Sequence, residues 1–221
     1  LGLSATPFRR DGLDPLIHFY LGDIIHNVKE DELIKSKAIM RPKVVSKFTD
    51  FDYPYDDDYQ KMLSSLIKDE NRNYQIVTDV VNESPKIEGT TLVVSDRVKH
   101  CKELSELIHT YGLKVELLTS QTGKKKRQAI VDKVQAGEVD VLVATIQLIG
   151  EGFDCSGLNA IFLTTPIKFK GRLIQTVGRI LRPSNGQKYV NPVIYDYIDN
   201  KVGVLKASSK KRHNTLRQIS I

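Results

Sequence analysis

The sequence predicts an α/β fold in which a doubly wound parallel sheet is covered by helices on both faces. Short runs rich in Val, Ile and Leu recur through the second half of the chain, and their interiors are apolar. Between them lie segments of about 10 to 15 residues whose apolar positions recur with the period of an α-helix. Strands that are apolar throughout and alternate with helices are typical of parallel sheets, which are buried on both faces.

The first half of the chain predicts helices and one edge strand. A short helix follows Pro15, and residues 41–47 form a β-branched stretch in which Pro42 suits only an edge strand or a strand start, because proline has no N–H to donate. Residues 60–82 contain two groups of apolar positions at helical spacing, which predicts two helices. The aspartates at 56–58 stand where the first of these begins, so we interpret them as its N-terminal cap and not as a functional acidic cluster.

The second half predicts the repeated strand and helix order of the fold. Strands are expected at 90–95, 114–119, 139–145, 160–165 and 193–198, and helices at 98–108, 124–135 and 172–181. In a sheet of this kind ligands bind beyond the carboxyl ends of the strands. Four of these ends carry Ser95, Thr119, Thr145 and Thr165. Hydroxyl groups are therefore expected along the ligand-binding edge.

The composition favours an intracellular protein with an anionic partner. The 221 residues carry a net charge of +6, with 40% hydrophobic and 27% charged residues, and no apolar run reaches the roughly 18 residues of a membrane span. Excess positive charge favours nucleic acid as a partner. Cys101 and Cys155 are too few for a disulfide framework and have no metal-ligand spacing to a histidine, so no metal site is expected. No signal peptide is recognisable at Leu1, and we expect the chain to be part of a longer protein.

One segment predicts a helix with a cationic stripe. From Gly171 to Arg182, a helical wheel places the polar side chains in a fan of roughly 80° and the apolar ones in a fan of roughly 120° on the opposite side. The polar side chains are Arg172, Gln175, Arg179 and Arg182, and the apolar ones are Leu173, Ile174, Val177, Ile180 and Leu181. Guanidinium groups bind phosphate oxygens two at a time, so the stripe suits a polyanion. A solvated basic face is the alternative.

Three motifs, in this order along the chain, resemble the signatures of superfamily 2 helicases and translocases. The first is Gly2-Leu-Ser-Ala-Thr-Pro-Phe-Arg9, the second is Val143-Ala-Thr-Ile-Gln-Leu-Ile-Gly-Glu-Gly-Phe-Asp154, and the third is the pattern Q-x-x-G-R-x-x-R formed by Gln175, Gly178, Arg179 and Arg182. The first motif, followed by Arg10-Asp-Gly12, is most similar to the branch that holds XPB-like repair translocases and the motor subunits of restriction enzymes.

The resemblance implies a domain organisation. Residues 1–12 would be the tail of a first motor domain, 13–84 a connector with a helical segment, 85–200 a RecA-like helicase C-terminal domain and 201–221 a basic C-terminal tail. The chain has no G-x-x-x-x-G-K-[ST] loop and no Asp-Glu pair after an apolar strand to hold Mg²⁺. ATP and Mg²⁺ would therefore be held mainly by the first domain.

The resemblance also implies residues that act on the nucleotide. Arg179 and Arg182 match arginine fingers that stabilise the charge on the transferred γ-phosphoryl group. Gln175 matches a position that contacts the nucleotide or the facing domain. Gly152 and Asp154 match a loop that binds the nucleotide, where glycine lets the backbone approach closely and a carboxylate can accept from ribose hydroxyls.

Contacts with nucleic acid are implied for a second group of residues, which are Ser95, Arg97, Thr145 and Arg127. Ser95 and Thr145 end strands, where hydroxyls and backbone amides suit sugar-phosphate oxygens and read no base. Arg127 lies near the predicted start of a helix beside Lys124–Lys126, where charge and helix dipole both favour a phosphate.

The sequence thus predicts the second motor domain of an ATP-dependent helicase or translocase acting on nucleic acid. Double-stranded DNA is favoured, and the first RecA-like domain of the same protein is the expected partner. Ser4 and Thr6 match the motif that couples nucleotide state to strand binding in such motors. Two alternatives stay open: a non-catalytic nucleic-acid-binding or regulatory domain that keeps the fold, and the motor part of a restriction-type nuclease. No membrane partner is expected, and the isolated chain is expected to be inactive as an ATPase.

Overall fold

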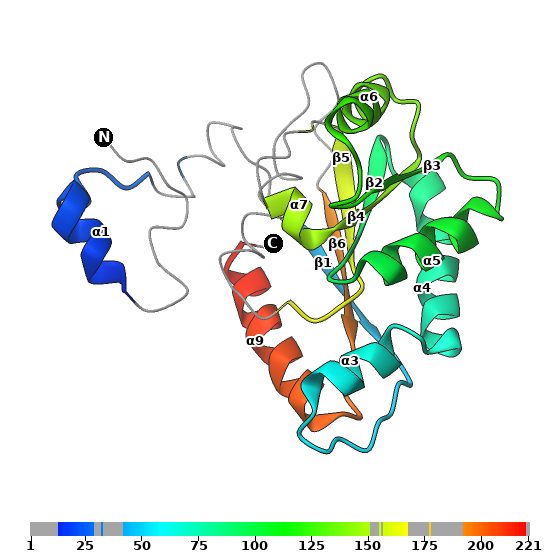
Figure 1. Cartoon of the computed structure of the whole chain (residues 1–221), viewed down its shortest axis with the longest axis horizontal. Helices are drawn as coiled ribbons and strands as arrows, with labels where there is room; N and C mark the ends of the chain where they lie inside the picture. The colour runs from blue at the N-terminus through cyan, green and yellow to red at the C-terminus, as the bar shows by residue number, and fades with distance from the viewer. Residues whose placement is uncertain are drawn as a thin grey trace.

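Within the residues that the structure describes, six parallel strands form one sheet (Figure 1). The structure is a computed structural model, and it describes residues 13–28, 32, 42–150, 155, 157–167, 177 and 192–219. The strands are β1 (Lys43–Phe48), β2 (Thr90–Ser95), β3 (Val115–Leu118), β4 (Val141–Thr145), β5 (Leu158–Leu163) and β6 (Val193–Ile198), in the spatial order β1-β6-β5-β2-β4-β3. The predicted α/β class is confirmed, and every strand begins and ends within two residues of its predicted range.

Helices cover both faces of this sheet. The described helices are α1 (Asp14–Leu21), α3 (Tyr59–Leu66), α4 (Glu70–Glu83), α5 (Val98–His109), α6 (Lys124–Gln135), α7 (Ile146–Gly150) and α9 (Gly203–Ile219), with a 3₁₀ turn η1 (Ser84–Lys86) after α4. Those that pack on the faces of the sheet are α4, α5, α6, α7 and α9. Side chains of α4 and α5 join one apolar cluster, and those of α6, α7 and α9 join another. In Figure 1, α4 and α5 accordingly lie on one side of the sheet and α7 and α9 on the other. No helix in the described ranges is both long and apolar enough to cross a membrane.

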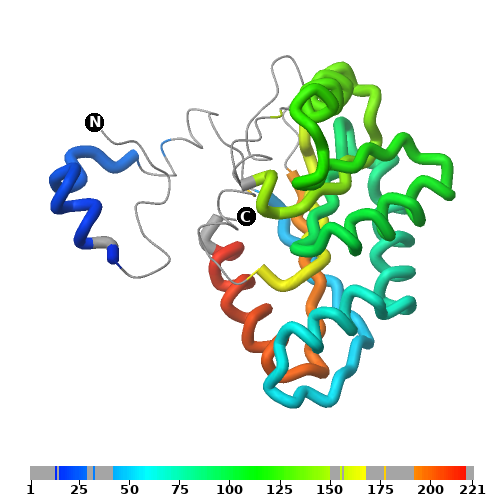
Figure 2. Tube along the Cα trace, viewed as in Figure 1, coloured from blue at the N-terminus to red at the C-terminus, as the bar shows by residue number. Residues whose placement is uncertain are grey.

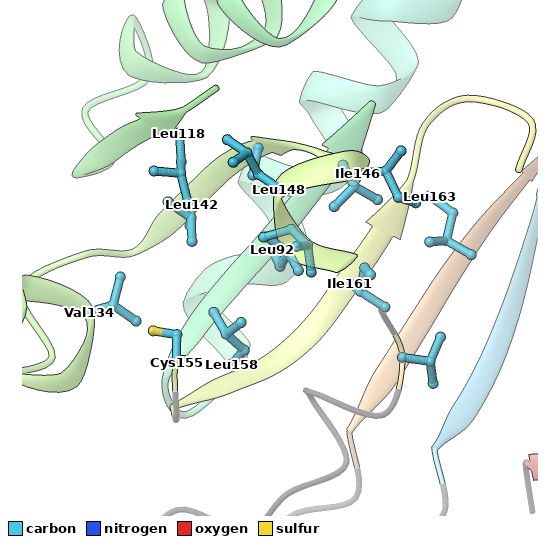
Figure 3. Packing of buried hydrophobic residues seen from close by; sticks show 14 of the residues in the cluster. Leu92, Leu118, Val134, Leu142, Ile146, Leu148, Cys155, Leu158, Ile161 and Leu163 are labelled. Carbon is cyan, nitrogen blue, oxygen red and sulfur yellow. The ribbon is translucent and has the colours of Figure 1, made fainter. Parts of the chain in front are cut away.

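Successive side chains of each strand point to opposite faces, so each strand feeds both clusters. On β5, Ile161 and Leu163 belong to the cluster with α6, α7 and α9, whereas Ala160 and Phe162 belong to the cluster with α4 and α5. Figure 3 shows the first of these clusters between the strands and the helices that cover them. Because both faces are buried, the strands need apolar residues at every position, which explains the continuous apolar runs of the sequence.

Strand β1 is the edge strand that the sequence predicts. It begins directly after Pro42 and, among the described strands, pairs with β6 alone, in a parallel register from Lys43 opposite Val193 to Phe48 opposite Ile198. The missing N–H of proline therefore lies at the start of an edge strand, where the sheet loses little.

The helix α3 begins as predicted and closes one end of the sheet. Asp58 accepts hydrogen bonds from the backbone N–H groups of Gln60 and Lys61, which confirms the N-terminal cap. Met62 and Leu66 of α3 pack with residues at the start of α9 in a third apolar cluster. This cluster anchors the segment between β1 and α4 to the rest of the fold.

The segment 201–221, for which the sequence predicts a basic tail, contains the helix α9. Leu205 and Leu216 are at most 1% exposed, and Arg212 lies buried against Asp196 of β6. In Figure 2 the red C-terminal segment runs alongside the sheet. The buried positions recur at helical spacing, but the lysines between them dominate the composition. The core accordingly extends beyond the range 85–200 that the sequence assigns to the domain.

Candidate nucleic-acid and nucleotide interface

The carboxyl ends of the described strands meet at one edge of the sheet, because all of them are parallel. Each end carries a hydroxyl or carboxylate side chain, at the last residue of the strand or within two residues of it. These are Thr49, Ser95, Thr119, Thr145, Thr165 and Asp199, none of them more than 4% exposed. A row of polar groups therefore lies at the edge where α/β sheets bind their ligands.

Several of these groups are hydrogen-bonded within the chain. The hydroxyl of Thr49 donates to Oδ1 of Asp199 (2.6 Å), and the same oxygen accepts from Nε of Arg72 (2.7 Å). The hydroxyl oxygen of Thr119 accepts from the backbone N–H of Gln121 at 3.3 Å. These bonds hold the ends of β1, β6 and β3 in place.

Ser95 is hydrogen-bonded to a buried histidine. Its Oγ lies 2.9 Å from Nδ1 of His100 and accepts from the backbone N–H of Arg97 at 3.1 Å. On the other side of the ring, Nε2 lies 3.0 Å from Oδ1 of Asn73, whose side-chain nitrogen donates to the carbonyl of Ile67 at 2.9 Å. An amide oxygen can only accept, so Nε2 carries the ring proton and Nδ1 accepts from the Ser95 hydroxyl.

The surroundings of His100 maintain this arrangement at neutral pH. Burial, and next to it the charge of Arg72, lowers the pKa of His100 to about 3. The ring is therefore neutral and keeps the hydroxyl hydrogen of Ser95. In this geometry Ser95 shapes the loop between β2 and α5, and its contact with nucleic acid stays a prediction.

Asp96 connects three strand ends. Its backbone N–H donates to Oγ1 of Thr165 at 2.8 Å, and its carboxylate accepts from Nε2 of Gln147 at 2.8 Å. Thr165 follows β5 and Gln147 belongs to α7, which follows β4, while β2 lies between β4 and β5. The two hydrogen bonds thus hold the central loops of the edge to one another.

Thr145 differs from the other hydroxyl residues of the edge. Its Oγ1 is buried and has no hydrogen-bond partner in the part of the chain that the structure describes. A buried polar group left in this state costs about 1–3 kcal/mol, which a bound ligand atom or water would offset. Thr145 ends β4, which lies between β2 and the edge strand β3, so the residue with spare hydrogen-bonding capacity lies between the ends of these two strands.

Two predicted phosphate-binding arginines are held in different ways. Arg97 is partly exposed and donates through Nη2 to the side-chain oxygen of Gln60, the second residue of α3. Arg127 lies in the first turn of α6, next to the exposed Lys124–Lys126, and its Nε has no hydrogen-bond partner among the described residues. The N-cap of α6, Gly123, offers no side-chain cap. A phosphate would meet both the charge and the open N–H groups of this turn.

The remaining predicted site residues lie outside the described residues. They are Ser4, Thr6, Gly152, Asp154, Gln175, Arg179 and Arg182. Val177, from the middle of the predicted arginine helix, is described, and its side chain is fully buried in the cluster of α6 and α7. This burial agrees with the apolar side to which the helical wheel assigns Val177.

Sequence reasoning missed the residues that hold this edge together, which are Gln60, Asn73, Asp96, His100 and Gln147. One of them left a signal. His100 lies one turn before Leu104 and two turns before Ile108, on the buried side of α5. A polar residue on an apolar stripe indicates a buried hydrogen bond, and that reading would have pointed from His100 to Ser95.

Comparison with known proteins identifies the family. The model of the helicase conserved C-terminal domain matches residues 72–184. "Putative helicase 22" of Sulfolobus islandicus filamentous virus (isolate Iceland/Hveragerdi) is 29% identical in an alignment that covers 89% of this chain and 38% of the viral protein. "Putative ATP-dependent RNA helicase L396" of Acanthamoeba polyphaga mimivirus is 26% identical over 97% of this chain and 41% of its own length.

The third relative also has a solved structure. The ATP-dependent DNA helicase uvsW of Enterobacteria phage T4 is 24% identical over 96% of this chain and 43% of its own length. The crystal structure of T4 UvsW has a TM-score of 0.65 at 18% identity, covering 81% of this chain and 40% of that chain, which shows a common fold. The chain spans about two fifths of the length of these relatives, and they do not confirm the predicted XPB-like branch. Since the family model covers half of the residues and the fold agrees, the chain belongs to the helicase conserved C-terminal domain family of superfamily 2.

Proposed function

We propose that the chain is the second motor domain of an ATP-dependent helicase or translocase that tracks along nucleic acid, with double-stranded DNA as the favoured substrate. The observation that carries the proposal is the hydroxyl of Thr145, which has no partner among the described residues and lies at the end of β4 on the strand-end edge of a helicase-family fold. A phosphate or sugar oxygen of the backbone would accept from this hydroxyl whatever the base. The name of T4 UvsW favours DNA, and that of L396 makes RNA the competing substrate.

The backbone contacts extend from Thr145 to its neighbours on the edge. Arg97, oriented by Gln60, and Arg127, at the start of α6, would bind phosphates on either side. Ser95 would set the position of Arg97 through the loop that both residues share.

The nucleotide contacts are assigned to Gln175, Arg179 and Arg182. On a helix that buries Val177, a helical wheel places these three side chains roughly 140–200° around the axis from it, away from the apolar core. Arginines in that place would stabilise the charge that spreads over the γ-phosphoryl oxygens. The loop at 152–154 would contact the nucleotide, and a first RecA-like domain would supply the phosphate loop and Mg²⁺.

Ser4 and Thr6 would couple the state of the nucleotide to the binding of the nucleic-acid strand. The first motif, to which they belong, favours an XPB-like or restriction-type motor. A regulatory domain that kept the fold is the second candidate. It has no need for a pair of arginines at the γ-phosphate, so the pair disfavours it.

The nucleotide half is tested in the full-length protein by Arg182→Ala. Nucleic-acid-stimulated ATP turnover should fall on the order of a thousandfold or more, because the contact is made mainly in the transition state. Binding of nucleic acid should persist, and circular dichroism should show a folded domain. Val177→Asp is the matched control, since a buried charge should unfold the domain and abolish both properties. Turnover within about twofold of the parent would show that the arginine helix has a structural role only.

The nucleic-acid half is tested by Thr145→Val, which removes the hydroxyl and keeps the shape. Affinity for a DNA duplex should fall about three- to tenfold, the value of one hydrogen bond of about 1 kcal/mol. Thermal stability should stay equal or rise, because an unpartnered buried hydroxyl is removed. Thr145→Ser should bind like the parent. Equal affinity of the valine and serine variants would exclude Thr145 from the interface.

A further inference from the structure

Helix α9 carries an unbalanced positive charge. Its five basic residues are Lys206, Lys210, Lys211, Arg212 and Arg217, and its sequence contains no Asp or Glu. Arg212 is buried against Asp196, whereas the other four are exposed. None of these four forms an ion pair within the described chain. We refer to Lys206, Lys210, Lys211 and Arg217 as the α9 basic face.

The orientation of this face is set by the buried side of the helix. Nε of Arg212 donates to Oδ1 of Asp196 at 2.6 Å, and Nη2 donates to the carbonyl of Tyr197 at 3.0 Å, so the helix is joined to β6 by charge and by backbone. Leu205 and Leu216 are buried one turn or more on either side of Arg212. The helix cannot rotate about its axis without exposing these groups, and its cations therefore point outward from a rigid support.

The cations form a line along the helix. A helical wheel places Lys206, Lys210 and Arg217 within about 40° of one another, with Lys211 to one side. The line is roughly 16 Å long at 1.5 Å per residue. That length corresponds to about five base pairs of a duplex at 3.4 Å per base pair. A small anion would need only one or two of these cations, whereas a polymer with regularly spaced charges can meet all of them.

The arrangement also has a cost that a merely solvated surface would avoid. Lys206 and Lys210 are four residues apart, where like charges destabilise a helix. On the opposite face of the sheet the helices are balanced or acidic: α5 has two lysines and two glutamates, and α4 has three acidic residues and one arginine. The basic residues of α6 lie on the same face of the sheet as α9. Among these four helices, the positive charge is therefore concentrated on one face of the sheet.

We propose that the α9 basic face binds the phosphate backbone of nucleic acid, as a second contact surface in addition to the strand-end edge. The choice of nucleic acid as the polyanion rests on the proposed function. Lysines and arginines on a rigid helix bind phosphate oxygens whatever the base, so these contacts would contribute affinity and no sequence preference.

The test replaces all four residues of the α9 basic face by glutamine and measures binding of the 221-residue chain to a DNA duplex over a range of salt concentrations. Neutralising phosphates releases counterions, so each lost contact lowers the steepness of log K against log salt by about 0.9. The variant should lose about two to four units of slope and at least tenfold in affinity at low salt. The matched control replaces Lys68, Lys99, Lys102 and Lys114, which are exposed cations away from α9, and should keep the slope of the parent within about one unit.

The outcomes separate the proposal from its competitors. Equal slopes for the α9 variant and the control would overturn it, and a normal effect of Thr145→Val in the same assay would then leave the proposed function standing. Binding to phosphatidylserine vesicles that depends on α9, with duplex binding unchanged, would overturn it in favour of a membrane surface. Circular dichroism checks folding. If the fourfold variant is unfolded, Lys206→Glu with Lys210→Glu reverses two exposed charges and should reduce the slope by about two units.

Discussion

Strand β6 and the residue that follows it contribute two buried aspartates, one to each face of the sheet, and the two are held differently. Asp199, just after the strand, accepts two hydrogen bonds from Arg72 of α4 and a third from Thr49. Asp196, within the strand, accepts one from Arg212 of α9, and its Oδ2 has no partner in the described chain. Burial raises the pKa of Asp196 although Arg212 opposes the shift.

Both aspartates pair with an arginine, so the identity of the two residues does not decide how much a buried ion pair contributes to stability; the number of hydrogen bonds that each carboxylate accepts also matters. A carboxylate with both oxygens occupied and a bidentate arginine is compensated for its loss of water. A carboxylate with one oxygen unoccupied is partly uncompensated and is closer to taking up a proton. Loss of the arginine should thus destabilise the fold more at the Arg72–Asp199 pair on the α4 side of the sheet than at the Arg212–Asp196 pair on the α9 side.

The largest expected effect comes from removing the arginine of the complete pair. Arg72→Met leaves Asp199 buried without its main partner and should lower the free energy of unfolding by about 3–5 kcal/mol, as measured by urea denaturation. Adding Asp199→Leu should recover most of this loss, because the uncompensated charge is then gone. A single variant as stable as the parent would remove the distinction between the two sides.

The second effect should be smaller and depend on pH. Arg212→Met should cost about 1–3 kcal/mol at neutral pH, the range for a buried group left without a partner. The raised pKa of Asp196 means that the folded state binds this proton more tightly than the unfolded state, so protonation stabilises the fold as pH falls. The loss of unfolding free energy caused by Arg212→Met should therefore become smaller as the pH is lowered from 7 to 5. A cost that grows over this interval would show that Asp196 stays charged.

The third effect concerns His100, and here a lower pH destabilises the fold, whereas protonation of Asp196 stabilises it. His100 stays neutral in the folded state down to its pKa of about 3, whereas in the unfolded state it takes up a proton near its ordinary value of 6.5. The unfolded state takes up this proton between pH 6.5 and pH 3, whereas the folded state does not. As pH is lowered through this window, the unfolding free energy of the parent should therefore decrease by up to about 1.4 kcal/mol per pH unit because of His100. His100→Gln should flatten the curve of unfolding free energy between pH 6 and pH 4. Nitrogen NMR of the imidazole should show the proton on Nε2 throughout, and parallel curves for the two proteins would mean that His100 titrates normally.

The smallest effect is expected on the exposed surface of α6. Lys133 pairs with Glu116 at 2.6 Å, but its side chain is half exposed. Such pairs are screened by solvent, so Lys133→Ala should change Tm by no more than about 2 °C in a thermal scan. A larger shift would mean that charges on the α9 side of the sheet contribute to stability in the way that Arg72 does on the other side.

Much of the fold could be predicted because burial on both faces leaves a direct mark in the sequence. The runs at 90–95 and 193–198 coincide with β2 and β6, since every residue of such a strand must be apolar or hydrogen-bonded. The helix α9 was missed because the lysines between its buried positions outweighed a weak apolar period. The short helix α7 was missed because it continues directly from the apolar strand β4 and has no boundary in composition.

The candidate site likewise has a part that could be predicted from the sequence and a part that could not. Ser95 and Thr145 could be placed at the edge because parallel strands bring their carboxyl ends together. The contacts of Asp96 with Gln147 and Thr165 join residues 51 and 69 positions apart, and they exist because β2 lies between β4 and β5. The apolar pattern of a single segment predicts a strand or a helix, but it does not determine which strands become neighbours in the sheet. Partners that depend on this order could not be predicted.

The pairing of β1 with β6 has a consequence for synthesis on the ribosome. Lys43 lies opposite Val193, 150 residues later in the chain. At about 5–20 residues per second, the segment of β1 leaves the ribosome roughly 8 to 30 seconds before its partner is made. During that time Val44 and Val45 lack their partner strand β6, and the lysines at positions 43 and 47 discourage pairing with another nascent chain. Of the described strands, the one that is translated first can therefore pair only after the one that is translated last.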